Sequence, residues 1–178
     1  MHHLFDLGDG FWLGLRTLET VPEMLALTEK NIARLRRWEP WAQEDPTLAG
    51  TRLYTQLQLD QYARGTAVPA VLYDGEVAVG SVSMRLDRAN GSAELGYWID
   101  AGFEGQGLVT RACTALIGHA AAEGMSRVEI RAATGNVRSR RVAERLGFTH
   151  ERVLPAAFPV GNVRLDVAVY ALALPPSE

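Results

Sequence analysis

The sequence predicts a single-domain α/β protein with a mixed, mostly antiparallel sheet and a central β-α-β unit. Its 178 residues fit one domain, expected over residues 1–178 with a core from about residue 11 to 174. The hydrophobic period changes from helical spacing in the first third of the chain to alternation from Val68 onward. A strand-helix-strand succession between Ser92 and Ala132 then requires two parallel strands.

The first predicted elements are a strand and two helices. Alternation predicts a strand from Phe11 to Leu18. Thr20-Val21-Pro22-Glu23 has the form of a capping box with proline in the first turn, and predicts a helix to about Trp38. Asp45-Pro46 predicts the start of a second helix, which runs to about Arg64.

Three strands in a meander come next. Apolar residues alternate from Val68 to the hairpin signal Asp74-Gly75, and the pattern resumes from Val77 to about Leu86. A second turn at Arg88-Ala89-Asn90-Gly91 leads into the third strand, Ser92 to Asp100.

Two helices alternate with the remaining strands. Helices are predicted from Gly107 to about Glu123 and from Asn136 to Leu146, each followed by glycine. The strands are Arg127–Ala132, Thr149–Leu154 and Arg164–Leu174, the last two joined at Gly161-Asn162. The order is β-α-α-β-β-β-α-β-α-β-β, and only the strands at 92–100 and 127–132 are expected to be parallel.

Composition excludes several classes of protein. The single cysteine, Cys113, rules out a disulfide framework and a multi-cysteine metal site, and we expect no metal. A net charge of −3 argues against direct nucleic-acid binding. No apolar run approaches the roughly 18 residues of a membrane span. Residues 1–6 lack the features of a signal peptide and are interpreted as a short polar terminus, so a cytoplasmic protein is expected.

The sharpest local feature is the loop Gly105-Gln106-Gly107-Leu108-Val109-Thr110, between a strand and a helix. Glycines let a ligand approach the backbone, and the free N–H groups of the helix N-terminus suit a phosphate. The loop lacks the third glycine of a dinucleotide fingerprint and the Gly-Lys-Ser/Thr of a P-loop. A tight turn without a ligand is the equally weighted alternative.

Together with its surroundings, the loop resembles the acyl-CoA motif of the GNAT N-acetyltransferases, in particular their RimJ/RimL branch. The resemblance spans nearly the whole chain, and its ordered set of segments is specific although each one alone is not. It is carried by residues 31–41, Glu94-Leu95-Gly96-Tyr97-Trp98-Ile99, Phe103-Glu104-Gly105-Gln106-Gly107, residues 127–131, Asn136-Val137-Arg138-Ser139 and residues 141–148. Two positions depart from the superfamily loop: Glu104, which would put a carboxylate near the expected pyrophosphate, and Val109.

The resemblance implies a GNAT-like fold and direct acetyl transfer from acetyl-CoA to an amine, with no covalent enzyme intermediate. The implied cofactor-binding residues are Trp98, Ile99, Gly105, Gln106, Gly107, Leu108, Val109, Thr110, Asn136, Arg138, Ser139 and Arg141. The helical spacing of Cys113 places it on a buried face, as a core thiol and not a nucleophile.

Three catalytic roles follow from the resemblance. The backbone N–H at about Ile99 stabilises the oxyanion, and Ser139 donates to the departing thiolate. The competing interpretation of Ser139 is a first-turn hydroxyl that bonds the helix backbone. Glu94 matches the base of parts of the superfamily; a carboxylate paired with arginine on the sheet face, or a water chain as the base, are the alternatives.

Arginine supplies 17 of the 18 basic residues, which codon bias explains for the chain as a whole. Between Arg127 and Arg152, however, the sequence contains seven arginines and only three acidic residues. Arg138, Arg140 and Arg141 open the last helix, where arginines suit the phosphates of CoA. Solvated surface is the alternative for each of them.

The acceptor site is expected beside Trp38 and Trp41, which flank Glu39-Pro40. These rings would either stack on a substrate or plug a helix-to-sheet contact. The leading acceptor is a protein N-terminal amine, of the ribosomal-protein type. A small amine, an aminoacyl nucleotide and a non-catalytic CoA-binding module are the alternatives. The oligomeric state is left open, and a homodimer is compatible with the sequence.

Overall fold

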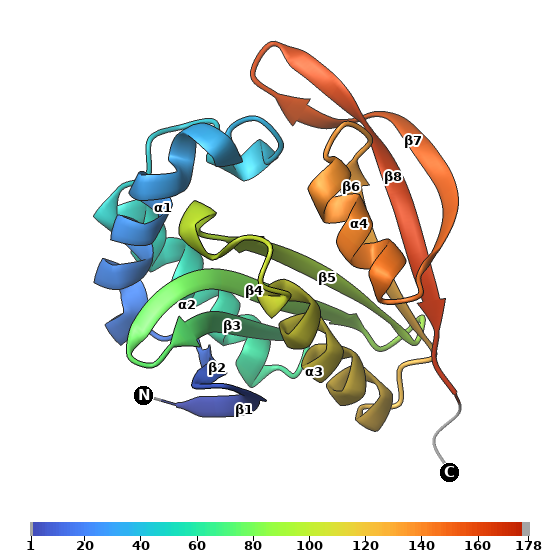
Figure 1. Cartoon of the computed structure of the whole chain (residues 1–178), viewed down its shortest axis with the longest axis horizontal. Helices are drawn as coiled ribbons and strands as arrows, with labels where there is room; N and C mark the ends of the chain where they lie inside the picture. The colour runs from blue at the N-terminus through green and yellow to red at the C-terminus, as the bar shows by residue number, and fades with distance from the viewer. Residues whose placement is uncertain (1, 176–178) are drawn as a thin grey trace.

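The structure is a computed structural model that describes residues 2–175. Eight strands form one sheet in the order β1-β2-β3-β4-β5-β6-β8-β7, and β5–β6 is the parallel pair among otherwise antiparallel neighbours (Figure 1). The strands are β1 His3–Gly8, β2 Phe11–Leu15, β3 Ala67–Asp74, β4 Val77–Asp87, β5 Ser92–Ile99, β6 Arg127–Ala133, β7 Thr149–Val160 and β8 Val163–Ala173. The helices are α1 Val21–Leu35, α2 Leu48–Ala63, α3 Leu108–Ala122 and α4 Val137–Arg145. The predicted α/β class and mixed sheet are confirmed.

The N-terminal segment differs from the prediction, because residues 3–8 form an edge strand and not a polar terminus. β1 pairs with β2, and its apolar side chains Leu4, Phe5 and Leu7 pack against the main core. The turn between the two strands has positive φ at Gly8, Asp9 and Gly10. Two register irregularities interrupt the pairing, which explains why simple alternation does not reveal the strand.

The predicted start of the first helix is confirmed, because α1 begins at Val21 with Thr20 as its N-cap and proline in its first turn, whereas the start of the second helix is displaced. The capping box belongs to Thr17 and Thr20, one turn before α1, where the Thr17 N–H donates to Thr20 Oγ1 at 3.3 Å. The second helix starts after Thr47, whose Oγ1 accepts the Gly50 N–H at 3.0 Å, and not at Asp45-Pro46. Asp45 instead forms an ion pair with Arg36.

Helices cover both faces of the sheet. On one face, Leu108, Ala112 and Leu116 of α3 join Val68 and Leu72 in the main core. On the other face, α1 packs Met24 and Leu27 against Val71 and Tyr73. Because neighbouring residues of β3 point in opposite directions, this strand is buried on both sides.

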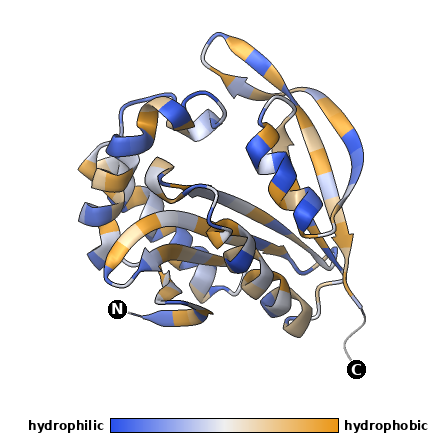
Figure 2. Ribbon diagram, viewed as in Figure 1, coloured by the Kyte–Doolittle hydropathy of each residue, from blue (hydrophilic) through white to orange (hydrophobic). Residues whose placement is uncertain are grey.

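The sheet opens between β5 and β6. The two strands pair from Ser92–Leu95 against Arg127–Ile130 and then separate, while β6 continues to pair with β8 as far as Ala133. In Figure 1 the opening lies between α1 with its following turn and α4 with the β7–β8 hairpin. Figure 2 shows that α4, beside this opening, is mostly hydrophilic, in contrast to α3.

β7 is longer than the predicted strand. It extends to Val160 through an irregular stretch between Leu154 and Phe158, where Ala156 has φ of 50°. The predicted turn at Gly161-Asn162 is confirmed. This turn approaches the segment after α1, since a Cβ on Gly161 would lie 3.7 Å from Gln43 Oε1.

Candidate active site

A cleft of about 1,090 Å³ lies where β5 and β6 separate. Its walls come from the end of α1, the end of β5, the glycine loop and the start of α4. The predicted site residues that line it are Trp38, Trp98, Ile99, Gly105, Gly107, Leu108, Val109, Thr110, Asn136, Arg138, Ser139 and Arg141. Gln106, Trp41 and Glu94 are the predicted residues outside the lining.

The glycine loop presents backbone to the cleft. Gly105 and Gly107 have φ of 78° and 75°, a left-handed conformation that favours glycine. No described atom lies within 4 Å of the place where a Cβ would stand on either glycine. Gly107 is the N-cap of α3 and no described side chain caps this helix, so its first N–H groups are available to an anion.

Ser139 is held at the start of α4 and bonded to the sheet. The Asn136 side chain caps the helix by accepting the Ser139 N–H at 3.3 Å. The Ser139 hydroxyl donates to the Tyr97 hydroxyl at 3.2 Å, and Tyr97 donates to Ser139 O at 2.9 Å. Burial raises the pKa of Tyr97, so its phenol stays protonated. A chain of two hydroxyl groups therefore faces the cleft.

The end of β5 offers an unpaired strand edge. The Asp100 N–H donates to Val79 O on β4 at 2.7 Å. Successive N–H groups of a strand point to opposite edges, so the N–H and C=O of Ile99 face the opening. Arg34 of α1 already donates to Ile99 O at 2.6 Å.

Glu104 is neutralised by arginines from two elements. Its carboxylate forms ion pairs with Arg34 of α1 and Arg138 of α4. The departure from the superfamily loop is therefore compensated in this structure. The same contacts bridge the cleft beside the glycine loop.

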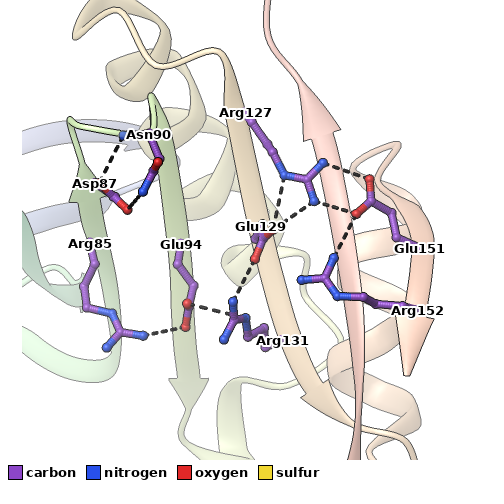
Figure 3. A network of polar contacts seen from close by, with 9 residues as sticks. All are labelled: Arg85, Asp87, Asn90, Glu94, Arg127, Glu129, Arg131, Glu151 and Arg152. Carbon is purple, nitrogen blue, oxygen red and sulfur yellow. Dashed lines mark hydrogen bonds and ion pairs between the residues drawn. The ribbon is translucent and has the colours of Figure 1, made fainter. Parts of the chain in front are cut away.

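Glu94 lies away from the Tyr97–Ser139 pair. Arg85 donates to its carboxylate at 2.6 Å, and Arg131 lies 3.6 Å from the other oxygen (Figure 3). These residues border a separate hollow of about 350 Å³. The pairing with arginine, one of the two alternatives for Glu94, is present, and its role as a base stays a prediction.

The arginines of residues 127–152 divide into three groups. Arg127, Arg131 and Arg152 belong to the ion-pair network of Figure 3. Arg140 turns from the cleft and donates to Tyr170 Oη and Thr134 O, both at 2.9 Å. Arg138, Arg141 and Arg145 line the cleft.

The segment after α1 closes the end of the cleft where the acceptor is expected. Trp38 packs on Gly135, where an added Cβ would lie 3.2 Å from the indole. The rings of Trp41 and Trp98 are 6.4 Å apart. The two predicted acceptor residues thus contact different walls of the opening.

Comparison with known proteins agrees with this geometry. The family model of the acetyltransferase (GNAT) domain matches residues 13–149. The chain belongs to the GNAT acetyltransferase family. As a GNAT protein it is an acyltransferase, and the predicted family and fold are confirmed.

Its similar relatives include a ribosomal-protein acetyltransferase and a proposed one. The chain is 40% identical over 148 residues to YdaF of Bacillus subtilis strain 168, a proposed ribosomal N-acetyltransferase, with 80% of each chain covered. It is 32% identical over 153 residues to the ribosomal-protein-serine acetyltransferase of Escherichia coli K12, with 85% of this chain and 86% of the relative covered. The solved structure of RimL, a ribosomal L7/L12 alpha-N-protein acetyltransferase in complex with coenzyme A, superposes with a TM-score of 0.91 at 28% identity, over 96% and 97% of the two chains.

Other features of this GNAT protein bear on its chemistry. Cys113 is fully buried in the main core and burial raises its pKa, which leaves a thiol and not a thiolate nucleophile. Residues 2–175 contain no cluster of side chains suited to a metal ion. Among the same residues, no helix combines the length and apolar character that crossing a membrane requires.

Sequence reasoning assigned no role in the site to several residues of the cleft, among them Tyr97, Arg34 and Glu39. Tyr97 could have been found, because alternation in β5 places it on one face with Leu95 and Ile99. Arg34 meets Glu104 across 70 positions of the chain, a separation that no local pattern reveals. Glu39 stood between the two tryptophans without a role of its own.

Proposed function

We propose that this GNAT acetyltransferase moves the acetyl group of acetyl-CoA to an α-amino group at a protein N-terminus, of the ribosomal-protein type. The observation that carries the proposal is the cleft itself. It joins an uncapped helix N-terminus, cleft-facing arginines and the Tyr97–Ser139 hydroxyl pair. The relatives described above support the choice of acceptor, and a ribosomal-protein acceptor implies work in the cytoplasm.

The residues of the cleft fit acetyl-CoA in a definite direction. The backbone of Gly105–Thr110 and the guanidinium groups of Arg138 and Arg141 suit the pyrophosphate and nucleotide end. Asn136 and the open edge of Ile99 suit the amides of the pantetheine arm. This direction places the thioester between Ile99 and Ser139.

Each residue near the thioester then has one task. The Ile99 N–H donates to the carbonyl oxygen as negative charge develops on it. The Ser139 hydroxyl, whose proton points to Tyr97 in this structure, turns that proton to the departing sulfur. The amine attacks directly, because the buried Cys113 thiol is not available as a nucleophile.

The test is an acceptor panel in one assay. Purified protein is incubated with acetyl-CoA and peptides that carry the N-termini of ribosomal proteins, with small amines and with an aminoacyl nucleotide, while free thiol and product mass are followed. We expect thiol release with acetylation of peptide α-amines. Preferred acetylation of a small amine or of the nucleotide would replace the acceptor class, and no acetylation of any acceptor would overturn the enzymatic proposal.

A further inference from the structure

Glu39 is a carboxylate of the cleft that the steps above do not use. It follows Trp38 and precedes Pro40, where the chain leaves α1 and enters a short 3-10 turn, Pro40–Ala42. Its half-buried side chain lines the cleft together with Trp98 and Ser139. It therefore lies at the acceptor end and not in the glycine loop.

The carboxylate of Glu39 is left without a cation. Two acidic residues line the cleft, Glu39 and Glu104, and Glu104 is bound by Arg34 and Arg138. Within residues 2–175 no ion pair reaches Glu39, whose side chain accepts one hydrogen bond, from Trp41 Nε1 at 3.1 Å. An incoming cation would meet Glu39 as the free negative charge of this cleft.

One indole bonds the same carboxylate, and two further indoles line the same cleft. Trp41 bonds Glu39 directly and lies 6.4 Å from the ring of Trp98. Trp38 precedes Glu39 and packs on Gly135 beside the start of α4. Indole faces attract ammonium groups, most strongly where water is partly excluded. A carboxylate bonded to one indole, in a cleft lined by two more, is thus suited to a primary ammonium.

Glu39 is also electrostatically coupled to the hydroxyl pair at the thioester. Burial is the main cause of the raised pKa of Tyr97, and the negative charge of Glu39 contributes to it. The Tyr97 hydroxyl is the partner of the Ser139 hydroxyl. Because Glu39, Tyr97 and Ser139 also line the same cleft, an amine held at Glu39 would share this cleft with the acetyl group of the proposed complex.

We propose that the Glu39 carboxylate binds the ammonium group of the acceptor and takes its proton before the attack. The inference rests on the proposed function and adds a named proton acceptor to it. One proton moves from the ammonium to a Glu39 oxygen and leaves the amine a lone pair. The nitrogen bonds to the acetyl carbon as the C–S bond breaks, and the nitrogen's second proton ends on the departing sulfur. Glu39 then loses its proton to water.

The surroundings of Glu39 favour this role over one for Glu94. Burial raises the pKa of Glu39, against the hydrogen bond from Trp41, so its carboxylate is a stronger base than an exposed one. Both oxygens of Glu94 face arginines, outside the cleft.

Few groups near Glu39 change charge in the same pH range. They are Tyr54 of α2, Tyr97 of β5 and the cleft residues Arg34, Arg37, Glu104 and Arg138. Burial raises the pKa of both tyrosines, and arginines keep their charge. Glu104 is held by its two arginines.

The variant that tests the proposal is Glu39→Gln, which keeps an acceptor for Trp41 but removes the charge. At pH 6.5 we expect kcat/KM for the peptide α-amine to fall about 100-fold, a usual contribution of a general base. The equilibrium Kd for acetyl-CoA, measured by calorimetry, should stay within about twofold of wild type. Glu39→Asp should recover part of the activity.

The pH profile separates a base from a structural role. Without the base, the variant reacts only with acceptor amines that are already neutral in solution. The acidic limb of its pH profile of kcat/KM should therefore move to about the pKa of a free α-amino group, near 8. The ratio of wild type to variant should approach one at pH 9.5. Glu44→Gln, an exposed carboxylate in the same segment, is the matched control and should behave as wild type.

The outcomes separate the two levels of the proposal. A wild-type enzyme that acetylates no amine overturns the proposed function. A wild-type enzyme that is active, with Glu39→Gln equal to Glu44→Gln or impaired equally at every pH, overturns the role of Glu39 and leaves the proposed function standing. Loss of acetyl-CoA affinity in Glu39→Gln would also overturn the role of Glu39 as a base, because the residue would then support the shape of the whole cleft.

Discussion

Glu104 holds arginines from both sides of the cleft. Its ion pairs with Arg34 and Arg138 connect α1, the glycine loop and α4. A pyrophosphate bound at the same loop would seek the same guanidinium groups. In the proposed complex, Glu104 and the cofactor therefore compete for these guanidinium groups, and the bridge would open when acetyl-CoA enters.

Removing this competitor should tighten cofactor binding. In Glu104→Gln we expect the Kd of CoA to fall about three- to tenfold. The gain is bounded because partly exposed ion pairs contribute up to about 1 kcal/mol each, and Arg138 is 76% exposed. Calorimetry with CoA measures the effect.

A truncated ligand shows whether the pyrophosphate is responsible. Acetyl-pantetheine lacks the diphosphate and should bind Glu104→Gln and wild type alike. Glu76→Gln, a change in an exposed turn, serves as the control. Weaker CoA binding in Glu104→Gln would mean that the bridge orders the cleft for its ligand and does not oppose it.

At the scale of elements, the start of α4 combines a helix cap with a ligand site. Asn136 caps the helix through the Ser139 N–H, and the same turn carries the Ser139 hydroxyl and Arg138 toward the cleft. Across the cleft, the glycine loop that Arg138 reaches leads into the uncapped N-terminus of α3. One helix start is thus stabilised by its own side chain, and the other is left for an anion.

Two substitutions of Asn136 should separate its two roles. Asn136→Ala removes the cap and should lower the free energy of unfolding by about 1 kcal/mol. Asn136→Ser keeps a capping oxygen, so its stability should stay close to wild type while its CoA affinity falls with the loss of the amide. Chemical denaturation and calorimetry measure the two quantities. Equal CoA affinity in Asn136→Ser and wild type would exclude the amide from cofactor binding.

Elements with a strong period were predictable from the sequence, and irregular ones were not. The meander β3–β4–β5 and the helices α3 and α4 follow simple alternation or end at glycine, and they appear where expected. β1 was missed because its pairing is irregular and three successive positive φ angles form its turn. The start of α1 was predicted correctly, but the start of α2 was displaced because Thr47, and not Asp45, supplies its cap.

The cleft was predictable where one local motif builds it. The glycine loop and the Asn136-to-Ser139 turn are each a few residues long, and both line it. The Arg34–Glu104 and Tyr97–Ser139 contacts join residues 70 and 42 positions apart. Such contacts depend on how far β5 and β6 separate, and the spacing of residues along the sequence does not predict this separation.

At the scale of the whole molecule, charged side chains tie together the end of the sheet where β5 and β6 still pair. Arg127 on β6 reaches past β8 to Glu151 on β7, with contacts of 2.8 and 2.5 Å, and also bonds Glu129 (Figure 3). The opposite end of the same strands is the open cleft. The network therefore holds the strands together at the closed end while they diverge at the other.

The network predicts how stability depends on pH. The hydrogen bond from Arg127 is the main cause of the lowered pKa of Glu151. Burial raises the pKa of Glu129, but hydrogen bonds from Arg127 and Arg131 outweigh it and bring this pKa below the ordinary value of 4.5. A carboxyl group with a lowered pKa stabilises the fold fully above its unfolded pKa and loses that contribution as pH falls through the folded value. The Tm of the wild type should thus fall as pH drops below about 4.5.

Arg127→Gln should remove much of this pH dependence. The variant should have a lower Tm than wild type at pH 7, and the difference should shrink as pH approaches 3, where the carboxyl groups are protonated in both proteins. Arg52→Gln, an exposed arginine of α2, should leave the pH profile unchanged. Calorimetric scans between about pH 3 and 7 measure the effect. A Tm difference that stays constant across this range would show that Arg127 stabilises the sheet by packing its aliphatic stem, because packing does not depend on the protonation of Glu129 or Glu151.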